Sequence, residues 1–141
     1  MTPARVPARF QRVVHEAAQG YCAYCHSREA LMGVTFEVEH IIPLSRGGKT
    51  TVDNLCLACP TCNRHKATRV TAVDPSTHKR VTLFHPIRDS WAAHFKWSPD
   101  DTELIGLTSI GRATIEALHM NRPAIIELRR YWVAVGHHPP E

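Results

Sequence analysis

The sequence lacks long apolar runs. No stretch of the 141-residue chain approaches the ~18 apolar residues of a membrane-spanning helix. The first residues, MTPARVPARF, contain arginines but no apolar segment like that of a signal peptide. Internal repeats and low-complexity tracts are also missing. We therefore expect a soluble, cytoplasmic protein with no membrane partner.

Most of the chain lacks an excess of positive or of negative charge. Lys and Arg number 17 against 13 Asp and Glu, which gives a net charge of +4. The window 41–72 holds five basic residues and one acid, so it carries the whole +4 and the remaining 12 basic and 12 acidic residues cancel. Apolar residues make up 43% and charged residues 21%, as in a folded domain. The local charge favours a polyanionic partner for this window.

Five cysteines are few for a disulfide framework, and a reducing compartment disfavours one. Four of them form two pairs, Cys22-x2-Cys25 and Cys59-x2-Cys62, whose two-residue spacers let both thiolates of a pair face one ion. We expect a closed, structural Zn²⁺ site, because four thiolates leave no open coordination position. Cys56 offers an alternative pairing with Cys59, although its place in an apolar strand favours a role as a small buried side chain.

Periodicity and breakers predict an α+β chain with the order helix, strand, loop, strand, helix before residue 70. In this first part the expected segments are a helix over 8–19, a strand over 35–39, a loop over 43–49, a strand over 54–58 and a helix over 60–68. After residue 70 we expect strands over 81–84 and 103–107 and helices over 109–118 and 123–135. Thr108 and Asn121 are the expected caps of the last two helices, and His137 and His138 are expected in a frayed terminus.

The segment 21–66 contains CAYC, EHIIPLSRGG, DNL and ACPTCNRHK in this order. With these motifs it resembles the HNH endonucleases of the ββα-metal (His-Me finger) fold, in the subgroup with two CxxC zinc knuckles. The chain also resembles small stand-alone bacterial HNH nucleases. It implies a single nuclease domain over 1–141. The parts would be an N-terminal helix over 1–20, a zinc-stapled ββα-metal core over 21–70 and a mixed, largely helical C-terminal extension over 71–141.

The resemblance also implies roles for four residues of the motif. His40 would be the general base that activates water, and an imidazole with a reference pKa of ~6.5 suits that task. Asn54 would hold the loop that follows His40. Asn63 and Glu39 would bind the catalytic Mg²⁺ (or Mn²⁺). Glu39 stands where the family more often has Asp, and its extra methylene bears on the metal distance.

Each of these residues also has a structural interpretation. His40 alone would suit a buried histidine at a strand end, and Asn54 an ordinary turn. His65 competes with Asn63 as a metal ligand, but two residues along a helix place it about 200° away. The aromatic residues of 91–97 suit either a core or base stacking.

The concentrated positive charge predicts contacts with DNA, mainly to its backbone. The candidate DNA-binding residues are Arg46, Lys49, Arg64, Lys66 and Arg69. Solvated helix faces are the alternative interpretation. The function predicted is metal-dependent DNA endonuclease activity that hydrolyses phosphodiester bonds, in a monomer or a homodimer. A non-catalytic zinc-dependent nucleic-acid-binding module is the main alternative, and a zinc-stapled protein-interaction domain is a third.

Overall fold

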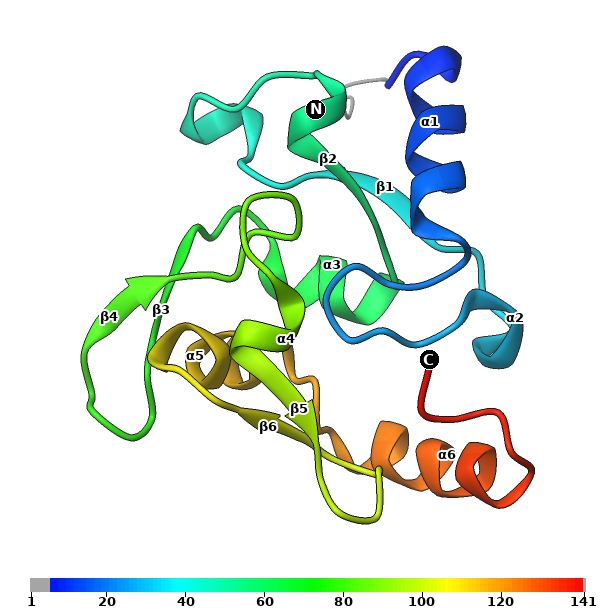
Figure 1. The fold of residues 1–141 in the computed structure, drawn as a ribbon. Coiled ribbons are helices and arrows are strands. Elements are labelled where there is room, and N and C mark those ends of the chain that lie inside the picture. Colours follow the sequence, from blue (N-terminus) through cyan, green and yellow to red (C-terminus); the bar gives the residue numbers. More distant parts are fainter. Residues whose placement is uncertain (1–5, 141) are drawn as a thin grey trace. The chain divides into compact units, whose positions relative to one another are not determined.

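The computed structural model describes residues 6–140 and combines helices with small antiparallel sheets, which confirms the predicted α+β class (Figure 1). The chain divides into two compact units, of which the first ends at Thr68 and the second begins at Arg69. The organisation as one nuclease domain stays a prediction, and each unit is described by itself. Over residues 6–140, no helix is long and apolar enough to cross a membrane.

The first unit begins with a helix that proline and glycine delimit. Its elements are α1 (Ala8–Ala18), α2 (Glu29–Met32), β1 (Glu37–His40), the 3-10 helices η1 (Leu44–Arg46) and η2 (Val52–Asn54), β2 (Leu55–Ala58) and α3 (Pro60–Lys66). Pro7 is the N-cap of α1, and Gln19 and Gly20 end the helix with φ values of 50° and 81°. This confirms the predicted helix, although residues 1–5 of the predicted N-terminal segment lie outside the described residues.

The β1–β2 hairpin is the centre of the first unit. Its antiparallel register pairs Glu39 with Cys56 and His40 with Leu55. All four residues of β2 are buried, which agrees with its continuous apolar sequence. Helix α1 packs on this hairpin, and α3 contacts β1 (Figure 1). The predicted order of strand, loop, strand and helix is confirmed.

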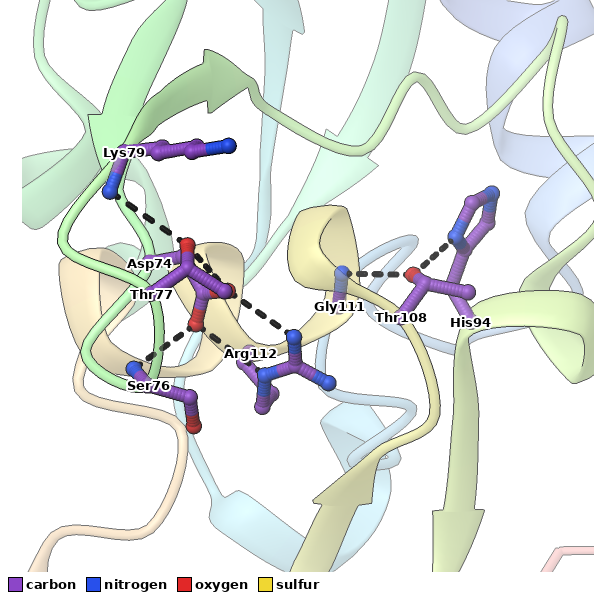
Figure 2. A network of polar contacts seen from close by, with 8 residues as sticks. All are labelled: Asp74, Ser76, Thr77, Lys79, His94, Thr108, Gly111 and Arg112. Carbon is purple, nitrogen blue, oxygen red and sulfur yellow. Dashed lines mark hydrogen bonds and ion pairs between the residues drawn. The ribbon is translucent and has the colours of Figure 1, made fainter.

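The second unit places one helix against two small sheets. Its elements are β3 (Thr71–Val73), β4 (Arg80–Thr82), α4 (Trp91–His94), β5 (Phe95–Trp97), β6 (Leu104–Gly106), α5 (Ser109–Leu118) and α6 (Pro123–Ala134). Strand β3 pairs with β4 and β5 with β6, and α5 contacts β3, β4 and β6. Thr108 caps α5 as predicted, because its Oγ1 accepts a hydrogen bond from the backbone N–H of Gly111 (Figure 2).

Two predictions about the second unit are wrong. Asn121 does not cap α6, whose N-cap is Arg122. The Asn121 amide instead bonds both backbone groups of Leu104, at 2.8 Å each, and so ties the turn between α5 and α6 to β6. His138 is not frayed but buried, because its ring packs edge-on against Trp97 and its Nε2 lies 2.9 Å from the carbonyl oxygen of Asp101.

The aromatic residues of 91–97 pack against one another. The Trp91 ring lies 5.2 Å from the Phe95 ring and 5.9 Å from the Trp97 ring, measured between centroids. Phe95 is only 1% exposed. The core interpretation therefore describes this segment better than base stacking does.

Candidate active site and metal centre

Four cysteine side chains converge at the junction of the first knuckle and helix α3. The Sγ atoms of Cys22, Cys25, Cys59 and Cys62 all lie within 4.8 Å of one another, and every one of these residues is buried. The Sγ atoms of Cys25 and Cys59 are 3.9 Å apart. Thiolates at ~2.3 Å from a tetrahedral zinc ion lie about 3.8 Å from each other. The donor set and its spacing therefore fit a structural zinc ion.

Local hydrogen bonds fix the positions of the cysteines in this cluster. Cys59 is the N-cap of α3, with its Sγ accepting from the backbone N–H of Cys62 at 3.4 Å. The first knuckle is attached to β2 because Ala23 N–H donates to the carbonyl oxygen of Leu57 at 2.8 Å.

Cys56 lies outside this cluster. Its Sγ atom is 3.8 Å from the hydroxyl of Tyr24 and 3.7 Å from Oε1 of Glu39, and burial raises its pKa. The structure therefore forms the two-knuckle arrangement and not the alternative pairing of Cys56 with Cys59.

His40 is the last residue of β1 and is half-buried. Its Nε2 lies 2.8 Å from the hydroxyl oxygen of Thr50, which orients the ring. Partial burial and, secondly, the positive charge of Lys66 lower the pKa of His40. A lowered pKa favours the uncharged imidazole, which is the form that can accept a proton.

Asn54 closes the loop that follows His40. Its Oδ1 accepts from Ile42 N–H at 2.9 Å, and its Nδ2 donates to the carbonyl oxygens of Ile42 at 3.0 Å and Lys49 at 2.9 Å. The loop is so tight that a Cβ atom on Gly48 would lie 1.8 Å from the Ile42 carbonyl oxygen and 2.9 Å from Asn54 Nδ2. Asn54 is 8% exposed, so these bonds are shielded from water and hold the loop firmly.

The two acids of β1 have different surroundings although they share one face of the strand. Glu39 is 6% exposed, and burial raises the pKa of its carboxyl to about 6. Glu37 is exposed, and the Asn63 amide donates to its Oε1 at 3.4 Å. The structure thus brings Asn63 beside Glu37. Sequence reasoning did not single out Glu37, although its spacing of two residues from Glu39 could have indicated it.

Lys66 has an internal position. It is 2% exposed, and its ammonium donates to the carbonyl oxygen of His40 at 3.3 Å. Its charge also lowers the pKa of Glu39, against the larger effect of burial. A buried ammonium does not offer the exposed charge that a phosphate contact needs. We therefore correct its assignment and leave Lys66 out of the candidate DNA-binding residues.

The other basic residues fall into two groups. Arg46, Lys49 and Arg64 are exposed in the first unit, where Arg46 Nε donates to the carbonyl oxygen of Thr68 at 3.2 Å. Arg69 belongs to the second unit, and its guanidinium donates to the carbonyl oxygen of Ala117 at 2.8 Å.

His65 turns back on its own helix. Its Nδ1 lies 2.8 Å from the carbonyl oxygen of Thr61, one turn earlier in α3. The His65 ring therefore contacts a different group from the Asn63 amide, which donates to Glu37. The choice of Asn63 over His65 as the candidate ligand stays a prediction.

The four clustered cysteines, the histidine at the strand end and the loop held by Asn54 all lie on one continuous segment. Residues 22–69 match the HNH endonuclease family. This HNH segment spans about a third of the chain, from the first zinc ligand to just past α3. The match indicates a nuclease or nucleic-acid-binding function for the HNH segment. No curated protein matches the chain.

Proposed function

We propose that the protein is a metal-dependent DNA endonuclease that hydrolyses phosphodiester bonds. The observation that carries the proposal is the position of His40 within the HNH segment: a half-buried imidazole at a strand end, oriented by the Thr50 hydroxyl, with a pKa that burial lowers. Such a group can accept a proton from water at neutral pH.

Two contacts keep the proposed base in place. The Lys66 ammonium holds the backbone carbonyl of His40, and Asn54 holds the loop that begins two residues later. Small displacements of reacting groups lower rates steeply, so fixed positions are expected of catalytic groups. In the proposed reaction His40 takes a proton from the water that attacks phosphorus.

A divalent cation, Mg²⁺ or Mn²⁺, would be held by oxygen ligands from Asn63 and an acid of β1. When bound, the cation stabilises the negative charge that develops on the phosphate and on the leaving oxygen. The family pattern assigns Glu39 as the acid. The buried Glu39 carboxylate lies against Cys56, so its position fits this role poorly.

DNA is the proposed substrate, bound mainly through its phosphates. The exposed side chains of Arg46, Lys49 and Arg64 supply positive charge within the HNH segment. Contacts of this kind are salt-sensitive and carry little sequence information.

The burial of Glu39 favours a second candidate function. If the acid before His40 cannot reach a cation, the HNH segment would act as a non-catalytic, zinc-dependent nucleic-acid-binding module. That module would retain DNA without cleaving it.

The test is nicking of supercoiled plasmid by the zinc-loaded protein with Mg²⁺ or Mn²⁺. We expect the wild type to nick, His40→Ala to lose activity by ~100-fold or more, and the matched His65→Ala variant to remain active. A plasmid left intact by the wild type, or nicked equally by His40→Ala, would contradict the proposal. Salt-sensitive DNA binding without nicking would support the binding module instead.

A further inference from the structure

We propose that Glu37, together with Asn63, forms the divalent-cation site of the HNH segment. Glu37 is the exposed acid two residues before Glu39 on β1, and it is not the acid that the family pattern assigns. The inference rests on the proposed nuclease function only for the role of the bound cation. The site itself follows from the geometry of β1 and α3.

The spacing of the pair suits one small cation. The Asn63 Nδ2 and Glu37 Oε1 atoms are 3.4 Å apart. Two oxygens bound to the same Mg²⁺ at ~2.1 Å are separated by about 3 Å when adjacent and about 4 Å when opposite. A half-turn of the amide exchanges its nitrogen and oxygen, so the group that now donates to Glu37 can present an oxygen ligand instead. Little movement is needed to place both ligands around one ion.

The surroundings of the pair suit a hydrated cation. Glu37 is exposed and Asn63 is half-exposed, so water and a phosphate oxygen can reach the same ion. Mg²⁺ keeps several waters and takes only one or two protein carboxylates when a phosphate is also present. A site with one carboxylate and one amide at the surface matches this preference.

Glu39 has the opposite surroundings. Its side chain is 6% exposed, and its Oε1 is 3.7 Å from the Cys56 sulfur. The buried ammonium of Lys66 already interacts favourably with the Glu39 carboxylate. A divalent ion at Glu39 would have to lose its water and would be repelled by that ammonium. The Lys66 ammonium therefore neutralises Glu39 inside the protein, whereas the Glu37 carboxylate remains accessible from solvent.

Both proposed ligands stand on rigid elements. Glu37 is paired with Ala58 in the hairpin ladder. Asn63 directly follows the zinc-cluster residue Cys62 in α3, whose N-cap is Cys59. The zinc staple thus positions the helix that carries Asn63, which reduces the reorganisation needed for cation binding.

The experiment is a Mn²⁺ titration of the zinc-loaded full chain without DNA, followed by the electron paramagnetic resonance signal of free Mn²⁺. Glu37→Gln and Glu39→Gln are matched variants, because each removes one negative charge from the same face of β1. We expect Glu37→Gln and Asn63→Ala to weaken binding by ~10-fold or more, and Glu39→Gln by less than ~3-fold. Asn63→Asp should bind at least as tightly as the wild type, since it adds a second carboxylate.

Zinc content and circular dichroism of each variant show whether the fold is retained. If Glu37→Gln or Glu39→Gln loses its fold, Asn63→Ala and Asn63→Asp decide the question, because only folded variants are compared. The proposal is overturned if Glu39→Gln abolishes binding while Glu37→Gln retains it, or if the wild type binds no Mn²⁺ at millimolar concentrations. A protein that binds Mn²⁺ through Glu37 but never nicks plasmid would support this site and contradict the nuclease function.

Discussion

Each of the two units of the chain is stabilised internally by a different kind of interaction. In the first unit, four buried cysteines join the start of α3 to the knuckle after α1. In the second unit, an ion pair joins α5 to the turn after β3, beside a cluster of aromatic rings. The comparison predicts that the fold of the unit with the candidate chemistry depends on zinc, while the fold of the other depends on packing and on charge. Chelation and loss of the ion pair should therefore act on different units.

The ion pair of the second unit belongs to a small network of hydrogen bonds around the Asp74 carboxylate (Figure 2). The Asp74 carboxylate accepts from Nε of Arg112 at 3.0 Å and from Nη2 at 2.8 Å. It also accepts from the backbone N–H of Ser76 at 3.0 Å and from the hydroxyl of Thr77 at 2.9 Å. The Asp74 side chain is fully buried, so each of these bonds is shielded from water.

Removal of zinc is expected to have the largest effect. A structural zinc site contributes ~10–16 kcal/mol of apparent binding free energy, so a strong chelator, or Cys59→Ser, should unfold the first unit. Hydrogen exchange of residues 6–68 and zinc stoichiometry measure the loss. The matched control is Cys56→Ala, which removes a buried thiol outside the cluster and should keep one zinc ion per chain. Zinc loss in Cys56→Ala, or an intact first unit without zinc, would contradict the assignment.

Asn54→Ala should have the next largest effect, still within the first unit. It removes three hydrogen bonds to backbone groups, each contributing about 1 kcal/mol, so the unfolding free energy should fall by about 3 kcal/mol. Nicking should fall by ~100-fold, because the loop after His40 loses its fixed position. The neighbouring Asp53→Ala is the control, and equal losses in both variants would argue against the loop-holding role.

Loss of the Asp74–Arg112 pair should affect the second unit alone. Arg112 lowers the pKa of Asp74 below its value in the unfolded chain. The pair therefore stabilises the fold fully above that unfolded value, and the contribution is lost as the pH falls through the lowered pKa. Asp74→Asn should lower the melting temperature by several degrees at neutral pH and weaken its acid dependence.

A surface pair provides the control for this comparison. Arg130 and Glu127 lie 3.6 Å apart, and each side chain is 57% exposed. Exposed pairs contribute little, so Glu127→Gln should change the melting temperature by less than Asp74→Asn does. A loss of zinc on Asp74→Asn would contradict the separation between the two units.

The smallest effect is expected for the exposed charges of the HNH segment. Lys49→Ala should weaken DNA binding to a similar extent for all sequences and reduce the slope of log affinity against log salt concentration by about 1. Arg88→Ala, an exposed change in the second unit, is the comparison variant. Filter binding at several salt concentrations measures both, and an unchanged slope for Lys49→Ala would argue against a phosphate contact.

Local sequence was enough to predict much of the fold. The two CxxC spacings predicted the cysteine cluster because each spacing acts within a single turn. The helix over 109–118 was predicted to the residue, since Thr108 caps it. The Asp74–Arg112 pair was beyond such reasoning, because its partners are 38 residues apart and only tertiary structure brings them together.

The candidate site shows the same limit more sharply. The motif indicated an acid before His40, but burial of that acid depends on the register that sets Glu39 opposite Cys56. Lys66 was grouped with exposed basic residues because its sequence neighbours are basic. It lies three residues after Asn63 on α3, which contacts β1, and so its side chain is turned inward. Which side chains of a motif face solvent depends on packing and not on spacing.

The central claim is that the zinc cluster maintains the fold while a separate divalent cation and His40 perform the chemistry. The most direct test titrates Mg²⁺ into zinc-loaded protein with supercoiled plasmid and measures zinc content and nicking in the same samples. We predict one zinc ion per chain throughout, nicking that rises with Mg²⁺, and a His40→Ala protein that keeps its zinc but does not nick. Nicking at full zinc content that needs no added cation, or undiminished nicking by His40→Ala, would contradict the account.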